Sequence, residues 1–308
     1  MFLGIDGGQS STTALIGDET GRVVGYGRGG ECNHVKGPAG RDKFINAITG
    51  CVNAAGGAGM KFTAVCGGFS GGPADKEQLL AEMFPGAKIF ATNDGLIALT
   101  GATAGEPGII TIAGTGQFTF GRARDGRTAR AGGWGYVFGD EGGGFDLTRQ
   151  ALRAALREEE GWGPRTLLTG RLLAATGALS VNDLLHQFYT TDWPRPKIAA
   201  LSKLVDEAAV DGDEVAQDLI HAAAQQLAGY TSALRGMLFQ PGEVARVAWI
   251  GGVFQSELLL WRYRMLVELE DANRCGPPEM GPAAGALIEA YRHAGLDVEL
   301  KDVPAFLK

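Results

Sequence analysis

The sequence repeats one pattern twice: an apolar run, a break rich in glycine, and a second apolar run. In residues 109–120, the β-branched run Ile-Ile-Thr-Ile is broken by Gly-Thr-Gly before Phe-Thr-Phe. In residues 2–16, an apolar run ends in Asp-Gly-Gly and a second run begins after Ser-Ser. Because small side chains let backbone N–H groups approach an anion closely, this strand–loop–strand pattern is typical of a phosphate-binding turn. Its repetition predicts one phosphate-binding module used twice.

The residues after the first break distinguish the pattern from a dinucleotide-binding fold. Such a fold places a helix directly after its glycine-rich loop. Here Thr12, Thr13 and the apolar residues that follow favour a strand. The loop is therefore predicted to join a hairpin, and residues 2–29 are predicted to form three consecutive strands. The second copy is expected to run as strands to about residue 130.

Strands and helices are expected to alternate in the remainder of each half. In the first half we predict helices over 41–55, 74–83 and 96–104, and strands over 62–66 and 88–91. In the second half we predict strands over 109–112 and 244–250, helices over 145–159, 256–270 and 282–294, and mainly helical structure over 165–187 and 197–237.

The Gly105–Gly108 run is the best domain boundary and a natural hinge. It predicts an N-terminal domain over 1–107 and a C-terminal domain over 108–308, whose last helix could pack back on the first domain.

Composition excludes several classes of protein. The 308 residues are 45% hydrophobic and 20% charged, which favours a sizeable core over disorder. The net charge of −7 argues against a nucleic-acid partner. The four cysteines are spread out, as reduced thiols would be, and no apolar run approaches membrane-spanning length. The N-terminus enters a strand directly, so we expect a cytoplasmic protein without a membrane partner.

Four further motifs accompany the two glycine-rich loops. The six segments are GIDGGQSSTT (4–13), NH (33–34), TND (92–94), AGTGQ (113–117), GGWGYVFGDEGGG (132–144) and IGGVFQS (250–256). In this order the chain resembles the sugar kinase/Hsp70/actin superfamily and, within it, the N-acetylglucosamine kinase and BadF/BadG/BcrA/BcrD ATPase-like family. The resemblance implies an α/β fold of two duplicated actin-like (ribonuclease H-like) domains with a nucleotide cleft between them.

The resemblance implies ATP and Mg²⁺ as cofactors. The first loop would contact them through Asp6, Gly7, Gly8, Ser10, Ser11 and Thr12, with Asp6 holding Mg²⁺ through water. The second domain would contact the nucleotide through Thr115, Gly116, Gly251, Gly252 and Ser256. An Asx-turn role for Asp6 and an N-cap role for Ser256 stay open. No lysine follows a glycine, so there is no Walker A element, and neutralisation of the phosphates is expected from backbone dipoles, hydroxyls and Mg²⁺.

Asp94 is the predicted general base. It follows a strand, and phosphoryl transfer needs a carboxylate that orients the acceptor hydroxyl and takes its proton. The alternative is an N-cap for the helix predicted over 96–104.

The resemblance places the acceptor sugar against residues that supply polar groups and an apolar plate. These are Asn33, His34, Asp94, Gln117, Gly133, Trp134, Gly135 and Asp140. Core packing for Trp134, a loop role for His34 and helix-dipole complementarity for Asp140 stay open. Glu141 would support the loop or the metal.

The second loop departs from its relatives in a way that leaves the acceptor open. Animal-type N-acetylglucosamine kinases usually continue this loop as GTGSN, whereas here it reads GTGQF. The leading expectation is an ATP-dependent kinase of N-acetylglucosamine at its 6-hydroxyl, or of glucosamine or N-acetylmuramic acid, acting as a homodimer. One alternative is a BadF-type ATPase activator, whose cysteine-ligated iron–sulfur cluster has no matching cysteine pattern here. The other is a non-catalytic nucleotide or sugar sensor.

Overall fold

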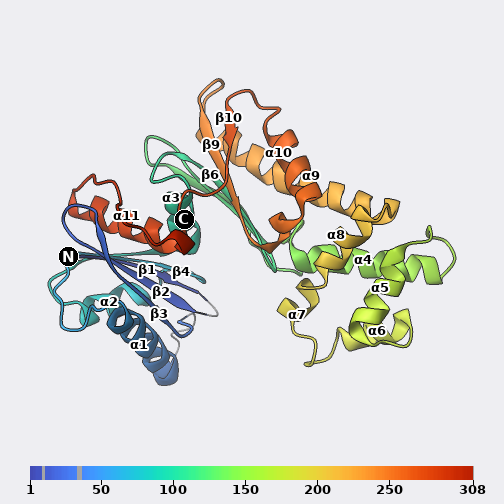
Figure 1. The fold of residues 1–308 in the computed structure, drawn as a ribbon, viewed down its shortest axis with the longest axis horizontal. Coiled ribbons are helices and arrows are strands. Elements are labelled where there is room, and N and C mark those ends of the chain that lie inside the picture. The colour runs from blue at the N-terminus through green and yellow to red at the C-terminus, as the bar shows by residue number, and fades with distance from the viewer. Residues whose placement is uncertain (9–10, 33–36, 308) are drawn as a thin grey trace. The chain divides into compact units, whose positions relative to one another are not determined.

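The structure is a computed structural model that describes residues 1–8, 11–32 and 37–307. The chain divides into two compact units (Figure 1). Unit 1 comprises residues 1–108, 121–126 and 277–308, and unit 2 comprises residues 109–120 and 127–276.

The first five-stranded sheet, sheet 1, has the strand order β3-β2-β1-β4-β5. Its strands are β1 (Phe2–Gly7), β2 (Thr12–Gly17), β3 (Val23–Gly29), β4 (Ala64–Phe69) and β5 (Lys88–Asn93). The central strand β1 is antiparallel to β2 and parallel to β4, and β4 is parallel to β5. The predicted hairpin after the first glycine-rich loop is confirmed.

The second sheet, sheet 2, has the order β10-β9-β6-β7-β8. Its strands are β6 (Gly108–Ala113), β7 (Gln117–Arg122), β8 (Thr128–Gly132), β9 (Ala245–Ile250) and β10 (Asn273–Cys275). Written as β8-β7-β6-β9-β10, this order repeats that of sheet 1 strand for strand. The prediction of a duplicated α/β module is therefore confirmed.

The first three strands of each sheet follow one another without a helix, and helices occupy the longer connections (Figure 1). Unit 1 contains α1 (Gly37–Ala54), α2 (Lys76–Met83), α3 (Asp94–Ala102) and α11 (Pro282–Ala294). Unit 2 contains α4 (Gly144–Glu159), α5 (Leu167–Thr176), α6 (Val181–Gln187), α7 (Arg195–Ala199), α8 (Ser202–Val210), α9 (Glu214–Leu238) and α10 (Glu257–Val267). Among the described residues, none of these helices is both long and apolar enough to cross a bilayer.

Sheet 1 buries apolar side chains on both faces. Leu3 of β1 belongs to a cluster with Phe44 of α1, whereas the adjacent Phe2 belongs to a cluster with Leu287 of α11. Alternate residues of a strand point to opposite faces, so α1 and α11 cover different sides of sheet 1. Parallel strands that are covered on both faces typically have continuous apolar runs in their sequences, and the parallel strands β1 and β4 of sheet 1 follow this pattern.

The last helix is built into unit 1, although we expected residues 277–308 in the C-terminal domain with only a potential return of that helix. Small residues make the packing close. A β-carbon on Gly285 of α11 would lie 1.9 Å from the carbonyl oxygen of Ile97 in α3. The contact therefore requires glycine at this position, and α11 and α3 pack backbone to backbone.

Several predicted boundaries are wrong, and pairing between strands explains the largest error. We expected the strand after Phe62 to end at Cys66, but β4 continues through two glycines to Phe69. Parallel neighbours hydrogen-bond this segment on both sides, and that pairing overrides the low strand propensity of glycine. The short edge strand β10 was not expected at all. Helix α1 begins four residues before the predicted start, at Gly37.

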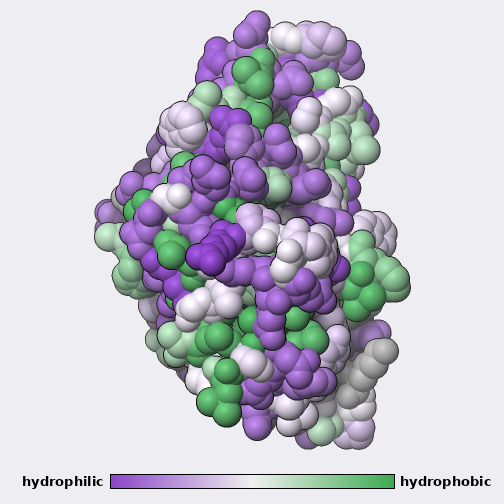
Figure 2. All heavy atoms as spheres, turned by 90° about the vertical axis from the view of Figure 1, so that its right-hand side faces the viewer, coloured by the Kyte–Doolittle hydropathy of each residue, from purple (hydrophilic) through white to green (hydrophobic). Residues whose placement is uncertain are grey.

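The face of the molecule shown in Figure 2 is mostly hydrophilic, and its hydrophobic residues occur in small groups among polar ones. Scattered apolar groups of this kind are normal on a protein surface.

Candidate active site

Three parallel strands of sheet 1 bring polar residues to one edge. Strands β1, β4 and β5 pair with one another up to their last residues. Asp6, Ser70 and Asp94 each lie within one residue of these ends. In open α/β sheets, ligands bind at the carboxyl ends of the parallel strands. This edge, here called the carboxylate edge, is therefore the first candidate for chemistry.

Asp94 is the first residue of α3, but it does not cap that helix. The N-cap is Asn93, whose side-chain oxygen accepts a hydrogen bond from the backbone N–H of Leu96 at 2.9 Å. The Asp94 carboxylate instead accepts from the Ser70 hydroxyl, with 2.8 Å between Oγ and Oδ2. The alternative interpretation of Asp94 as the N-cap is therefore wrong, because Asn93 is the N-cap. Ser70, which was not among the predicted site residues, holds one oxygen of the carboxylate.

Asp6 is a partly buried carboxyl group with a second carboxylate nearby. Burial, and then the negative charge of Asp94, raise the pKa of Asp6 to about 7. Both effects disfavour the charged form, and a bound cation would relieve both. Among the described residues, no group of three or more His, Cys, Asp or Glu side chains could hold a metal. Mg²⁺ is commonly held by one or two carboxylates together with phosphate and water, and Asp6, in this electrostatic setting, fits such an ion.

A buried lysine near the carboxylate edge was also not predicted. Lys76 is 3% exposed, and its Nζ donates to the carbonyl oxygen of Gly72 at 2.6 Å and lies 5.4 Å from the ring centre of Phe69. Burial lowers its pKa, against the charges of Cys32, Asp75 and Asp94, which raise it. The lysine therefore fastens the loop that follows β4. In the sequence, the signal that pointed to this loop was the glycine-rich run at 67–72.

The described residues on either side of the first glycine-rich loop, between β1 and β2, are hydrogen-bonded to each other. The N–H of Gly8 donates to the carbonyl oxygen of Ser11 at 3.0 Å, and the Ser11 hydroxyl accepts from Arg28 at 3.3 Å. Thr12 is fully buried, and its hydroxyl donates to the carbonyl oxygen of Gly30 at 2.7 Å. The Thr12 hydroxyl thus links the start of β2 to the residue after β3, whereas we expected Thr12 to contact the nucleotide.

Three of the predicted site residues, Ser10, Asn33 and His34, lie outside the residues that the structure describes.

In unit 2 the second loop, 114–116, is fixed to the start of α4. The N–H of Gly144 donates to the carbonyl oxygen of Gly114 at 2.8 Å, and that of Phe145 donates to the carbonyl oxygen of Thr115 at 3.0 Å. Asp140 packs its carboxylate against Gly116. It is 6% exposed and has a φ of 63°, a left-handed conformation that costs energy for a residue with a side chain. Strain of this kind clusters at functional sites.

Gln117 does not extend towards the loop as the predicted sugar contact would require. It is 3% exposed, and its Nε2 donates to the Thr119 hydroxyl at 2.8 Å. Its Oε1 packs against Gly132 and is buried without a hydrogen-bond partner among the described residues. As the first residue of β7, Gln117 points into the interior of unit 2. The alternation of side chains along the strand explains why: Gln117 and Thr119 share one face.

The loop between β8 and α4 presents an aromatic ring between two glycines. Trp134 lies between Gly133 and Gly135 and is 66% exposed, so the core-packing alternative is wrong. The guanidinium of Arg130 lies 5.0 Å from the centre of its ring. Glu141 accepts a hydrogen bond from the Tyr230 hydroxyl of α9 at 2.5 Å, which gives Glu141 a role in supporting this loop.

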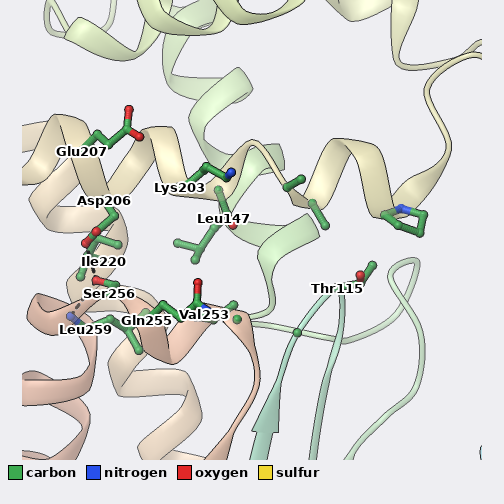
Figure 3. A pocket seen from close by; sticks show the side chains of 16 residues that line it. Thr115, Leu147, Lys203, Asp206, Glu207, Ile220, Val253, Gln255, Ser256 and Leu259 are labelled. Carbon is green, nitrogen blue, oxygen red and sulfur yellow. Dashed lines mark hydrogen bonds between the residues drawn. The ribbon is translucent and has the colours of Figure 1, made fainter. Parts of the chain in front are cut away.

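A cavity of about 610 Å³ lies within unit 2, beside the second loop (Figure 3). Its lining includes Gly114 and Thr115 of the loop, Gly252 and Ser256 after β9, and Leu259 of α10. Cavities of this size commonly hold small ligands. Thr115, Gly252 and Ser256 are thereby brought together, as the prediction of a nucleotide site in the second domain requires.

The segment after β9 that lines part of this cavity begins directly after Gly251 and ends at Ser256, and Gly251 itself is not among the lining residues. Gly251 has a φ of 114°, and a β-carbon there would lie 2.2 Å from the carbonyl oxygen of Ala113 in β6. Glycine is therefore required where the chain leaves β9. Ser256 is the N-cap of α10, accepting from the N–H of Leu259 at 3.1 Å, and its hydroxyl also donates to Asp206 of α8. Asp206 was not among the predicted site residues. Helix α8 lies far in the sequence from both the motif at 132–144 and the motif at 250–256, so no motif pointed to it.

Two curated proteins are similar to this chain over most of its length. An N-acetylmuramic acid/N-acetylglucosamine kinase from Clostridium acetobutylicum is 34% identical over 199 residues, 63% of this chain and 65% of that protein. The chain thus spans just under two thirds of this relative. An N-acetyl-D-glucosamine kinase from Dictyostelium discoideum is 29% identical over 246 residues, 74% of this chain and 76% of that protein.

The fold is also similar to solved structures of sugar kinases. A protein from Chromobacterium violaceum, provisionally assigned as an N-acetylglucosamine kinase, superposes with a TM-score of 0.70 at 26% identity over 93% of this chain and 97% of that one. The match to the BadF/BadG/BcrA/BcrD ATPase family extends over residues 3–290, and so covers both glycine-rich loops, Asp94 and the cavity of unit 2. The chain is therefore a member of the BadF/BadG/BcrA/BcrD ATPase family.

Proposed function

We propose that this protein is an ATP-dependent kinase of an amino sugar, with the 6-hydroxyl of N-acetylglucosamine as the leading acceptor and glucosamine or N-acetylmuramic acid as alternatives. The relatives described above support this class, since both curated proteins are named as N-acetylglucosamine kinases and one also as an N-acetylmuramic acid kinase. Within the chain, the proposal depends most on Asp94. Its carboxylate lies at the carboxylate edge and does not cap α3, because Asn93 is the N-cap.

In the proposed reaction Asp94 acts as the general base. Ser70 donates to Oδ2, which leaves Oδ1 to orient the sugar hydroxyl and take its proton. The sugar oxygen then forms a bond to the γ-phosphorus of ATP, the bond from that phosphorus to the bridging oxygen breaks, and ADP leaves.

Backbone groups of the two glycine-rich loops, around Gly7, Gly8, Thr115 and Gly116, would contact the phosphates. The nucleoside would occupy the cavity of unit 2, where Gly252 leaves room for it. Asp6 would hold Mg²⁺ through water, as burial and the nearby charge of Asp94 favour a cation there. Mg²⁺, when bound, neutralises charge on the phosphate oxygens. The nucleotide cleft between the domains stays a prediction of the sequence.

On the sugar side, two observations in unit 2 support the predicted contacts. The exposed ring of Trp134 offers a plate for a sugar ring, and the strained Asp140 offers a carboxylate to its hydroxyls. The buried Gln117 is not included in the proposal. The roles of Asn33 and His34, the homodimer and the cytoplasmic location stay predictions.

The alternative of a dehydratase activator finds no support in the cysteines. Cys32, Cys51 and Cys66 are buried, and Cys275 is partly buried. Burial raises the pKa of Cys51 and of Cys275 to about 12. A cluster shared with a partner needs thiols at the surface, and three of these four thiols lie buried inside the fold.

The proposal is tested by measuring ADP release with MgATP and a panel of N-acetylglucosamine, glucosamine, N-acetylmuramic acid and glucose. We expect release that depends on an amino sugar, and a sugar phosphate whose phosphorus NMR coupling identifies position 6. The same rate of ADP release with and without every sugar would contradict the proposal and favour an ATPase.

A further inference from the structure

Helix α8 contributes a charged wall to the cavity of unit 2 that the proposed function does not yet use. Lys203, Asp206 and Glu207 all line the cavity, together with Gln255 and Ser256 on the opposite side. Lys203 lies three positions before Asp206 and four before Glu207, so both acidic residues neighbour the lysine on the same side of the helix.

Among the described residues, the two acidic residues of this wall have partners and the lysine has none. Glu207 is paired with Arg171 of α5 at 3.5 Å, and Asp206 accepts a hydrogen bond from the Ser256 hydroxyl. In the part of the chain that the structure describes, no hydrogen bond or ion pair involves the Lys203 ammonium group. Of the described residues that line this cavity, Lys203 is also the only basic one.

The position of Lys203 along the cavity suggests which part of a nucleotide it would contact. In Figure 3, the Lys203 side chain points into the space between Thr115 and the Asp206–Ser256 pair. Thr115 belongs to the loop that we propose contacts the phosphates. Ile220 and Leu259 lie at the Asp206 end, and such apolar walls suit a nucleobase. Lys203 is therefore placed where the phosphate chain joins the nucleoside.

We propose, building on the proposed function, that Lys203 Nζ binds the phosphates of a nucleoside diphosphate or triphosphate next to the ribose. The glycine-rich loops contain no lysine of the Walker A kind, so a lysine that contacts the phosphates, in addition to Mg²⁺, would come from elsewhere in the chain. An ammonium group is a compact point charge with three donors, well suited to phosphate oxygens. The paired acids beside it do not compete, because Asp206 lies beyond it at the nucleoside end and Glu207 is bound to Arg171.

The test is calorimetric titration of the full chain with ADP and, separately, with adenosine, both with Mg²⁺ in excess. We expect Lys203→Met to weaken ADP binding roughly ten- to hundredfold, the range expected for one hydrogen bond to a charged group. Adenosine binding should change less than about twofold, because adenosine carries no phosphate. Lys203→Arg should restore most of the ADP affinity, and Lys61→Met, an exposed lysine of unit 1, serves as the matched control for loss of one charge.

The outcomes separate this inference from the proposed function. If the unaltered protein binds no ADP, the proposed function fails. If the unaltered protein binds ADP and Lys203→Met binds it equally well, the proposed function stands and the role of Lys203 is refuted. Equal weakening of ADP and adenosine would place Lys203 against the nucleoside and would also refute a phosphate contact.

Discussion

Sheets 1 and 2 have the same strand order, yet their central strands carry different chemistry. Counted from the start of each strand, Asp6 of β1 corresponds to Ile112 of β6, and Ile5 corresponds to Thr111. Strand β1 therefore carries a carboxyl group near its end, whereas β6 carries an apolar residue there. At the preceding position, β1 carries the apolar Ile5 and β6 carries the hydroxyl group of Thr111.

The hydroxyl in unit 2 ties the sheet to the helices around the cavity. Thr111 Oγ1 lies 2.9 Å from Thr231 Oγ1 of α9 and accepts from the Tyr263 hydroxyl of α10 at 3.0 Å. The same two helices contribute Ile220 and Leu259 to the cavity. A satisfied buried network of this kind fixes a unique packing. Unit 1 thus presents charge at its edge, whereas unit 2 fixes the walls of a cavity, and in our proposal the same topology serves two different tasks.

The largest expected effect tests the chemical task of unit 1. Asp94→Asn should lower turnover roughly 10²- to 10⁴-fold, because the amide cannot take the proton of the sugar hydroxyl. The free energy of unfolding should change little, since Asn93 keeps the helix cap. Asp42→Asn, an exposed acid of α1, is the matched control. Turnover close to that of the unaltered protein would remove Asp94 from the role of base.

The second prediction tests the binding task of unit 2. Gly252→Leu should weaken ADP binding by about 100-fold or more, roughly 2.7 kcal/mol, because the new side chain would project into the cavity. The fold should tolerate it, since no atom lies within 4 Å of a β-carbon at this position. Gly229→Leu, on the exposed side of α9, is the control, because its site is equally open. Undiminished ADP affinity in Gly252→Leu would mean that the nucleotide binds elsewhere.

The third prediction concerns residues 121–126, which belong to unit 1 although the residues before and after them belong to unit 2. Arg122 of this segment pairs with Glu289 of α11 at 2.6 Å, with side-chain exposures of 13% and 6%, and Glu289 also accepts from Thr100. Glu289→Gln should lower the free energy of unfolding by on the order of 3 kcal/mol, because it leaves a buried guanidinium unpaired. Glu82→Gln in the exposed pair with Arg41 should cost about 1 kcal/mol at most.

The pH dependence of this effect has a definite sign. Burial by itself would raise the pKa of Glu289, but the charge of Arg122 and the hydrogen bond from Thr100 outweigh it and hold the pKa below the ordinary 4.5. A carboxyl whose pKa is lowered by folding stabilises the folded state above its unfolded pKa, and this stabilisation is lost as the pH falls through the lowered value. The difference between the unaltered protein and Glu289→Gln should therefore shrink below about pH 4.5, as chemical denaturation at several pH values can show. A difference that stays constant to lower pH would contradict the ion-pair account.

The smallest expected effect concerns the cap at the cavity end of α10. Ser256→Ala should lower the free energy of unfolding by about 1 kcal/mol through loss of the N-cap, with less than about tenfold change in KM for ATP. Thermal unfolding and steady-state kinetics measure the two quantities. A KM raised far beyond that would show that the hydroxyl contacts the nucleotide, as the resemblance implied.

Patterns local in the sequence predicted the hairpins, the duplicated units and most helices, because alternation and glycine placement are local signals. They also predicted which strand ends carry Asp6 and Asp94. The same patterns could not tell that Asn93, rather than Asp94, would cap α3, since both residue types make good caps.

Other features of the structure depend on contacts between residues that are distant in the sequence. The burial of Gln117 depends on Gly132, and the use of the Thr12 hydroxyl depends on the carbonyl group of Gly30. Lys203 carries no motif, and only the packing of α8 beside the second loop brings it to the cavity. The return of α11 to unit 1 required the close contact of Gly285 with α3, which no periodicity reveals.

The division of tasks between the two units is tested most directly by titrating ADP, with Mg²⁺, into Asp94→Asn and Gly252→Leu alongside the unaltered protein. The account predicts that Asp94→Asn binds ADP with an unchanged Kd although its turnover is lost, and that Gly252→Leu loses ADP binding. Weakened ADP binding in Asp94→Asn together with normal binding in Gly252→Leu would contradict the assignment of catalysis to unit 1 and of nucleotide binding to unit 2.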